Sequence, residues 1–132
     1  MVKAVLRIRQ EDPIDFVVDD DTAIEKGTIC KLSDGRGAFP IQTEDDAVPC
    51  AGIARREKIA GDGRTRLAIY RKGIFDIKVA SGGTIGLGNQ VVISGVDAIA
   101  AALTDGTEDH AVLGKALEDG DKGEIIQIAV NL

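Results

Sequence analysis

The feature that most constrains this chain is its alternation of glycine turns with short apolar segments. Sixteen of its 132 residues are glycine and three are proline, and glycine supplies the positive φ angles that tight turns require. The segments between the turns are rich in Val and Ile, and several alternate apolar with polar residues, which is typical of strands. The pattern predicts an all-β fold, a compact barrel of short strands with at most one or two short helices.

Seven or eight strands are expected, separated by turns such as Gly61-Asp62-Gly63. Residues 96–103 are rich in alanine, and the sequence leaves them open between a helix and a strand. The expected strands are 4–9, 14–18, 27–32, 48–54, 65–70, 74–79, 90–93 and 124–130.

A weak internal repeat runs through the chain at a shift of about 60 residues. We therefore expect residues 27–132 to form one β domain with two similar lobes, 27–70 and 88–130. Residues 1–26 precede this domain either as an extended arm or as its first hairpin, and the sequence favours neither. The similar segments, in order, are 27–33 with 88–94, 51–54 with 113–116, and 61–69 with 120–128.

Charge is distributed unevenly. The net charge is −6 for the whole chain, but residues 51–80 carry eight basic and three acidic side chains, whereas residues 81–132 carry two basic and eight acidic ones. This is either an unevenly charged solvated surface or complementarity between the basic middle of one copy and the acidic end of another. Direct nucleic-acid binding fits less well, because the total is acidic and few aromatic residues accompany the arginines.

The sequence contains no catalytic, cofactor-binding or metal-binding pattern. Gly114-Lys115 lacks the first glycine and the final Ser or Thr of a phosphate-binding loop, and His110 is the only histidine. The acidic runs 19–21 and 44–46 lack the spaced ligands of a calcium loop and are better interpreted as solvated turns. No apolar run approaches the roughly 20 residues that span a bilayer, so no membrane partner is expected.

Cys30 and Cys50 are the only cysteines. We expect buried, reduced thiols, because free cysteine is among the most buried residue types. Their spacing alone does not decide whether they pair in a disulfide.

Three segments carry a resemblance that extends over about residues 14–132. They are Ala51-Gly52-Ile53-Ala54, Gly73-Ile74-Phe75-Asp76, and Leu113-Gly114-Lys115-Ala116-Leu117-Glu118 followed by the closing strand. In these segments the chain resembles the phage capsid cement (head decoration) protein family. The resemblance implies a tulip-like β domain that binds the outside of an icosahedral head as trimers after the shell expands.

The resemblance further implies a structural, non-enzymatic role. The partners would be the major capsid protein of the virus and further copies of the chain, and the location would be the outer surface of the virion, reached from the host cytoplasm. There the protein would brace the shell against the pressure of the packaged genome.

Two groups of residues are candidates for the capsid or subunit interface. The first lies in residues 1–26, whose extended chain could span on the order of 80 Å and add a strand to a neighbouring sheet. The second is the basic middle, which suits a closed ring of head-to-tail contacts. The candidates are Val5, Leu6, Ile8, Ile14, Phe16, Val18, Arg55, Arg56 and Lys58.

Two other functions stay open at this point. A free-standing β-barrel could bind a small apolar ligand in its interior. A tail or fibre component of the same virus would carry a similar sequence pattern, and the sequence does not separate it from a head protein.

Overall fold

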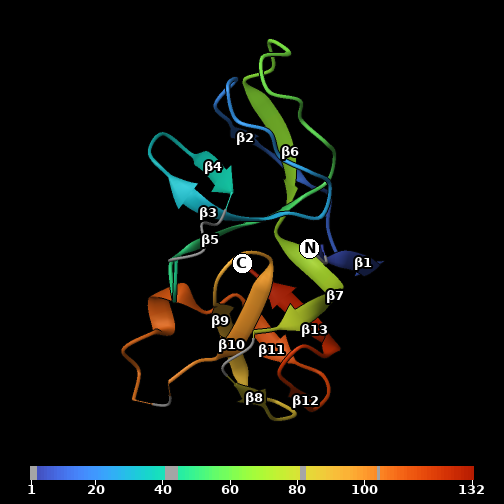
Figure 1. Ribbon diagram of the computed structural model, residues 1–132, viewed down its shortest axis with the longest axis vertical. Coiled ribbons are helices and arrows are strands. Elements are labelled where there is room, and N and C mark those ends of the chain that lie inside the picture. Colours follow the sequence, from blue (N-terminus) through green and yellow to red (C-terminus); the bar gives the residue numbers. More distant parts are fainter. Residues whose placement is uncertain (1–2, 41–44, 81–82, 104) are drawn as a thin grey trace.

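The computed structural model describes residues 3–40, 45–80, 83–103 and 105–132. As expected, the fold is all-β, with short strands, small closed barrels and, in the described residues, a single short 3₁₀ helix, η1 (Asp109–Ala111). The strands form two lobes that are stacked along the long axis of the molecule (Figure 1).

Lobe 1 (residues 14–70) is a closed five-stranded barrel with the order β2-β4-β3-β5-β6. Strand β2 returns to β6 with four antiparallel residue pairs, and this pairing closes the ring. The strands are β2 (Ile14–Val17), β3 (Ile29–Ser33), β4 (Gly37–Pro40), β5 (Cys50–Ala54) and β6 (Arg66–Tyr70).

Lobe 2 (residues 72–131) is built on the order β7-β10-β9-β11-β13, and β13 pairs back along β7 to close a second ring. The alanine-rich segment is the strand β10, which resolves the choice between helix and strand. The strands are β7 (Lys72–Val79), β9 (Gln90–Ile93), β10 (Ala98–Ala101), β11 (Gly114–Ala116) and β13 (Ile125–Asn131), with a two-stranded sheet of β8 (Thr84–Ile85) and β12 (Gly120–Asp121) beneath them.

The two lobes share one topology. In order, β2, β3, β4, β5 and β6 correspond to β7, β9, β10, β11 and β13, and each ring contains one parallel pair, β2–β4 or β7–β10, among antiparallel ones. The first two pairs of similar segments, 27–33 with 88–94 and 51–54 with 113–116, lie at these equivalent positions. In the third pair the structure makes Lys58, and not Gly61, the counterpart of Gly120. The lobe boundaries differ from the expected 27–70 and 88–130, because each ring also includes the strand that precedes these residues, β2 in lobe 1 and β7 in lobe 2.

Backbone hydrogen bonds repeat as well. Gly27 N–H donates to Ala54 O at 2.9 Å in lobe 1, and Gly88 N–H donates to Ala116 O at 2.9 Å in lobe 2. The isolated bridge between Ile24 and Lys58 corresponds to the pairing of Ile85 with Gly120.

Glycines at equivalent positions in β5 and β11 let the rings close tightly. A Cβ atom on Gly52 would lie 2.2 Å from Tyr70 O, and one on Gly114 would lie 2.1 Å from Ala129 O. Both distances are far below van der Waals contact, so the approach of β5 to β6 and of β11 to β13 requires glycine at these positions.

The lobes are joined by a shared core. Strand β5 is buried along its whole length, because one face of the β3–β5 pair fills lobe 1 and the other packs on lobe 2. Cys30 lies in the lobe 1 core, whereas Ile29, Cys50 and Ile53 belong to the lobe 2 core. Both cysteines are free and buried, as expected.

Asp97 also connects the lobes. Its buried carboxylate accepts hydrogen bonds from Lys3 Nζ at 2.5 Å and from Ile29 N–H at 3.1 Å. The turn before β10 in lobe 2 is thereby tied to the first residue of β3 in lobe 1 and to the described N-terminal segment.

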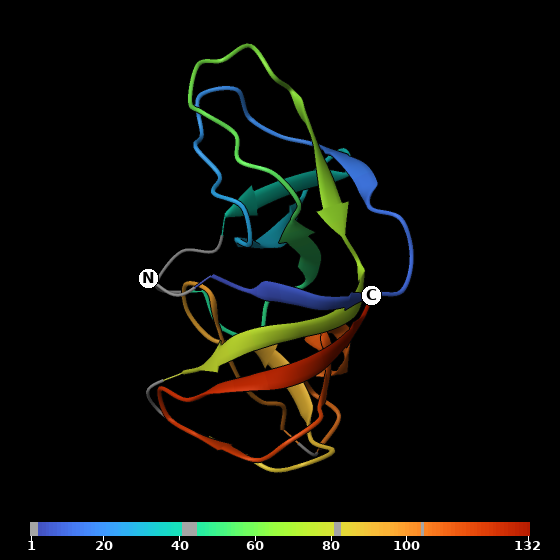
Figure 2. The ribbon, with the colours of Figure 1, turned by 90° about the vertical axis from the view of Figure 1, so that its right-hand side faces the viewer.

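The N-terminal region is neither of the two forms expected from the sequence. Strand β1 (Val5–Arg9) joins the edge of lobe 2 by antiparallel pairing with β7, and β2 is a wall of lobe 1. Figure 2 shows β1 lying across the molecule between the lobes. Each strand finds its partner in a different ring, so the segment is a built-in strap and not a detached arm or a hairpin.

Candidate interaction surface

Strand β1 is the most exposed strand that carries predicted interface residues. It lies at the edge of the six-stranded sheet, and among the described residues β7 is the one strand that pairs with it. Val5 and Ile8 are 50% and 55% exposed. Edge strands with free backbone groups pair readily with another chain, so β1 offers both main-chain and apolar contacts.

The other predicted apolar residues divide between surface and interior. Ile14 in β2 is 45% exposed, and Leu6 packs partly buried against the lobe 2 core. Phe16 and Val18, by contrast, are buried in the core of lobe 1. They point into the ring because β2 is one of its walls, so they are not surface residues of this chain.

A furrow with a basic rim runs from β1 along lobe 1. It begins as a hollow of about 460 Å³ between the lobes, whose lining includes Leu6, Ala54 and Tyr70. It continues past Lys26 to the exposed connection between β5 and β6. The cations of this basic furrow are Lys3, Lys26, Arg55, Arg56, Arg64 and Arg66.

The furrow is short of carboxylates. Of the acidic residues, Glu57 and Asp15 line it, and within the described part of the chain none of its four arginines has a carboxylate oxygen within 4 Å. Lys3 is paired with Asp97 and Glu25, but the four arginines present uncompensated positive charge beside an apolar floor, which suits an acidic, partly apolar partner.

Sequence reasoning identified Arg55 and Arg56 but missed Arg64, Arg66 and Lys26 as members of the same surface. The density of arginines in residues 51–80 was a usable signal. Only the antiparallel pairing of β5 with β6 shows which of them share one face.

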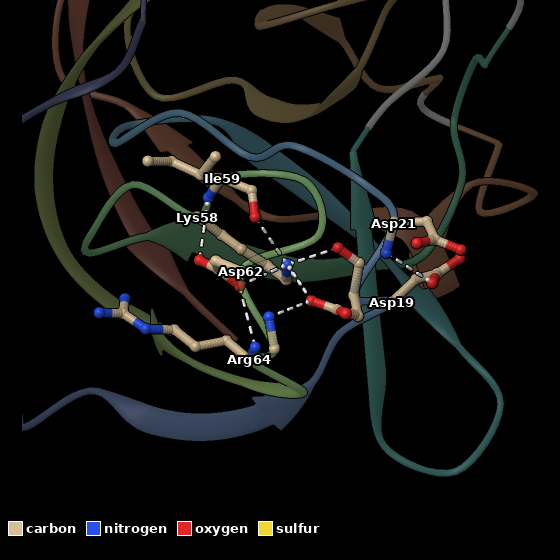
Figure 3. Close-up of polar contacts among 8 residues, drawn as sticks. Asp19, Asp21, Lys58, Ile59, Asp62 and Arg64 are labelled. Carbon is tan, nitrogen blue, oxygen red and sulfur yellow. Dashed lines mark hydrogen bonds and ion pairs between the residues drawn. The ribbon is translucent and has the colours of Figure 1, made fainter.

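Lys58, the third predicted basic interface residue, is not on the surface. Its side chain has no exposed area, and Nζ donates to Asp20 O at 2.7 Å, Ile59 O at 3.1 Å, and the carboxylates of Asp62 at 3.0 Å and Asp20 at 3.2 Å (Figure 3). The ammonium group thus occupies an oxygen-lined position between two loops of lobe 1.

The electrostatics of this Lys58 cluster favour the charged forms. Burial alone would lower the pKa of Lys58, but the hydrogen bonds and charges of Asp62 and Asp20 outweigh it and raise that pKa above its ordinary value of 10.5. The hydrogen bond from Arg64 N–H, followed by contact with Lys58, lowers the pKa of Asp62 to about 2. The cluster is suited to holding loops together and not to proton transfer near neutral pH.

The acidic runs are also drawn into ion pairs. Asp20, from the run 19–21, belongs to the Lys58 cluster, and Asp45 pairs with Lys31 at 2.9 Å; Glu44 lies outside the described residues. Among the described residues, no group of three or more His, Cys, Asp or Glu side chains is placed to hold a metal ion. The same residues form no helix long and apolar enough to cross a membrane.

Comparison with known proteins gives one family. The family model described as phage cement protein matches residues 8–132. A search of curated protein sequences gave no match. The matched region takes in both lobes and the last two residues of β1, Ile8 and Arg9.

Proposed function

The chain belongs to the phage cement protein family, and on that premise we propose that it binds the outer surface of an icosahedral viral head as homotrimers. There it stabilises the shell against the pressure of the packaged genome. Its partners in this proposal are the major capsid protein of its virus and further copies of itself. The observation that carries the proposal is the family match over nearly the whole chain.

The exposed edge of β1 supports a contact with the shell. An edge strand can pair with a strand of a neighbouring protein through main-chain hydrogen bonds, and the half-exposed Val5 and Ile8 add apolar area. A strand contact from each copy of a trimer would be modest alone and effective together, because linked sites bind at high effective concentration.

The two rival functions have no specific observation in their favour. The interiors of both rings are filled by side chains, such as Phe16, Leu67 and Ile69 in lobe 1. This filling does not favour the binding of an apolar ligand inside a ring. A tail or fibre role shares the family's viral setting, and it is separated from the head role by experiment.

The test is co-sedimentation of the purified protein with expanded empty heads, and separately with tails, of its own virus. We expect binding to heads at about three copies per local threefold axis and a rise in the temperature at which the heads rupture. Binding to tails alone, or a protein that stays in the supernatant at every ionic strength, would contradict the proposal.

A point variant tests the contribution of β1. Truncation of residues 1–18 is unsuitable, since it would remove Phe16 and Val18 from the lobe 1 core. We expect Ile8→Asn to weaken head binding, because it places an amide on the apolar edge. The matched control is Ile59→Asn in lobe 1, where the side chain is 62% exposed and lies in the loop that follows β5; it should leave head binding unchanged.

A further inference from the structure

The two lobes present equivalent surfaces of opposite character. Arg55 N–H donates to Ala68 O in lobe 1, and Leu117 N–H donates to Gln127 O in lobe 2, so the residues after β5 correspond to those after β11. Arg55-Arg56 thus occupies the position of Leu117-Glu118. By the same correspondence Lys26, before Gly27, takes the place of Leu87, before Gly88.

The lobe 2 counterpart of the furrow is acidic and apolar. Leu87 and Leu117 are 68% and 41% exposed. Leu87 N–H donates to the carboxylate of Asp119 at 2.6 Å and Gly88 N–H donates to Ala116 O at 2.9 Å, so the segments 87–88 and 116–119 lie next to each other. Carboxylates surround them, with Lys122 as the one basic side chain in residues 117–124. This acidic tip consists of Leu87, Leu117, Glu118, Asp119, Asp121 and Glu124.

Large apolar side chains that are exposed within a charged rim mark interaction sites more often than isolated ones do. The tip offers leucines and carboxylates, and the furrow offers an apolar floor with unpaired arginines. The carboxylates of the tip are complementary to the arginines of the furrow, and the leucines of the tip to its apolar floor.

The two surfaces cannot meet within one chain. The furrow lies along lobe 1 and the junction, whereas the tip belongs to lobe 2 and lies next to its β8–β12 sheet, which is at the far end of that lobe (Figure 1). Contact between them therefore requires a second copy. The contact is heterologous, because it joins different surfaces of two identical chains, and such contacts form rings when the rotation closes.

We propose that the acidic tip of lobe 2 docks into the basic furrow of lobe 1 of a second copy, and that this is the subunit contact of the protein. The inference rests on the homotrimer of the proposed function and names its two faces. Glu118, beside the exposed Leu117, meets Arg55 or Arg56 of the next copy, and Leu87 and Leu117 cover the apolar floor near Tyr70.

The repeat supplies a direct test, because the two residue pairs can be exchanged between equivalent positions. R55L/R56E gives lobe 1 the pair of lobe 2, and L117R/E118R gives lobe 2 the pair of lobe 1. Each variant alone leaves like charges facing each other. The fourfold variant R55L/R56E/L117R/E118R exchanges the charges of this pair between the two faces and restores complementarity at the pair.

The measurement is the mass of the full chain by sedimentation, without heads, across a range of ionic strength. We expect the wild type to self-associate and to dissociate as salt shortens the Debye length from about 30 Å at 0.01 M to about 8 Å at 0.15 M. Each pair variant should self-associate at least about tenfold more weakly, and the fourfold variant should regain association. A mixture of the two pair variants should associate more strongly than either variant alone, because the exchanged pair of each variant then meets the opposite charge on the other.

Arg36→Glu, in the exposed β3–β4 turn outside the furrow, is the control for charge alone, and circular dichroism of each variant checks the fold. A wild type that stays monomeric at low ionic strength, or pair variants that associate normally, would overturn the inference. Head binding separates this result from the proposed function. If heads are decorated while the exchange has no effect on self-association, the cement function stands and the named faces are wrong.

Discussion

Lobe 1 and lobe 2 form rings of the same topology, but different interactions close the two rings at one equivalent position. Lys58 in lobe 1 and Gly120 in lobe 2 form equivalent bridges. Lobe 1 closes this end with a buried ammonium group that binds the oxygens of two loops. Lobe 2 closes it by packing, since a Cβ on Gly120 would lie 2.6 Å from a methyl group of Ile126.

The surrounding turns are nevertheless the same. Ile59 N–H donates to the carboxylate of Asp62 at 3.2 Å, and Asp121 N–H donates to that of Glu124 at 2.6 Å. A carboxylate three residues along caps the turn in both lobes. The backbone hydrogen bonds therefore define each ring. The residue at the bridge, Lys58 or Gly120, determines whether this end of the ring is stabilised by charge or by apolar contact.

The largest effect is expected from core truncation, which tests whether the two lobes are energetically separate. Phe16 pairs with Leu67 in lobe 1, and Ile77 pairs with Ile126 at the equivalent place in lobe 2. Phe16→Ala should cost about 3–5 kcal/mol and Ile77→Ala about 2–5 kcal/mol in the free energy of unfolding. Because the cores meet at β5, both should lower a single transition.

Denaturant unfolding followed by two probes checks this. Tyr70, whose ring stacks edge-on with Phe75 at 5.8 Å, reports on the junction, and thiol labelling of Cys30 reports on the lobe 1 interior. Burial raises the pKa of this thiol, so labelling requires opening. Separate midpoints for the two probes in Phe16→Ala would mean that lobe 2 folds without lobe 1.

The next effect is expected at the glycines where each ring closes. Gly52→Ala and Gly114→Ala should each cost about 1–3 kcal/mol, because the added methyl group meets a backbone carbonyl that cannot move freely. Gly83→Ala is the control, since its Cβ would meet open space. Thermal unfolding measures the loss of stability. Equal losses at Gly52 and Gly114 would support the equivalence of the two positions, and a neutral result at either would contradict it.

A smaller effect is expected from Lys58→Met, which keeps the volume and removes the charge. The variant should lower the thermal stability, because it leaves the carboxylates of Asp20 and Asp62 without their ammonium partner. Lys122→Met, on the equivalent loop of lobe 2 and exposed, should be neutral. Equal melting temperatures for Lys58→Met and the wild type would show that packing alone closes lobe 1.

The same cluster predicts a pH dependence. The pKa of Asp62 is lowered to about 2 from an ordinary value of 3.8, so its contribution is present above pH 3.8 and is lost as the pH falls from about 4 to about 2. The contribution of Lys58, whose pKa is raised, is lost only as the pH rises beyond 10.5. Acid titration of stability should be shallower in Lys58→Met; an unchanged titration would mean that the hydrogen bond from Arg64 N–H dominates.

The smallest effect on stability is expected from exchanging Arg55-Arg56 with Leu117-Glu118. The positions are mostly exposed, so the exchange should change the free energy of unfolding by no more than about 0.5 kcal/mol. Thermal unfolding at high ionic strength measures this change. A large loss would indicate that these side chains support the fold of their own lobe, and would remove them as reporters of subunit contact.

Much of the fold could be predicted from the sequence, because turn glycines and β-branched segments are local signals. The repeat was visible for the same reason, as Gly27 and Gly88 begin equivalent strands with positive φ angles of 83°. What could not be predicted was partner choice. Strand β1 alternates like any edge strand, and nothing in Val5–Arg9 specifies β7, more than 60 residues away, as its partner.

The candidate surface was predicted in part. Val5, Ile8, Ile14 and Arg56 are exposed. Lys58 is a candidate because it belongs to the basic residues 51–80, and its pairing with Asp20, 38 residues away in the sequence, is visible only in the tertiary structure.

The order of the strands along the chain determines the order in which they can pair during synthesis. As the polypeptide leaves the ribosome, residues 14–70 contain every strand of lobe 1, so this ring can close while lobe 2 is still being translated. Strand β1 emerges before lobe 1, but its partner β7 (Lys72–Val79) emerges only after the strands of lobe 1, and β7 also pairs with β13, which emerges later still. Strand β1 is thus made before lobe 1 but is paired only after it, and throughout translation of lobe 1 its apolar residues can contact other proteins.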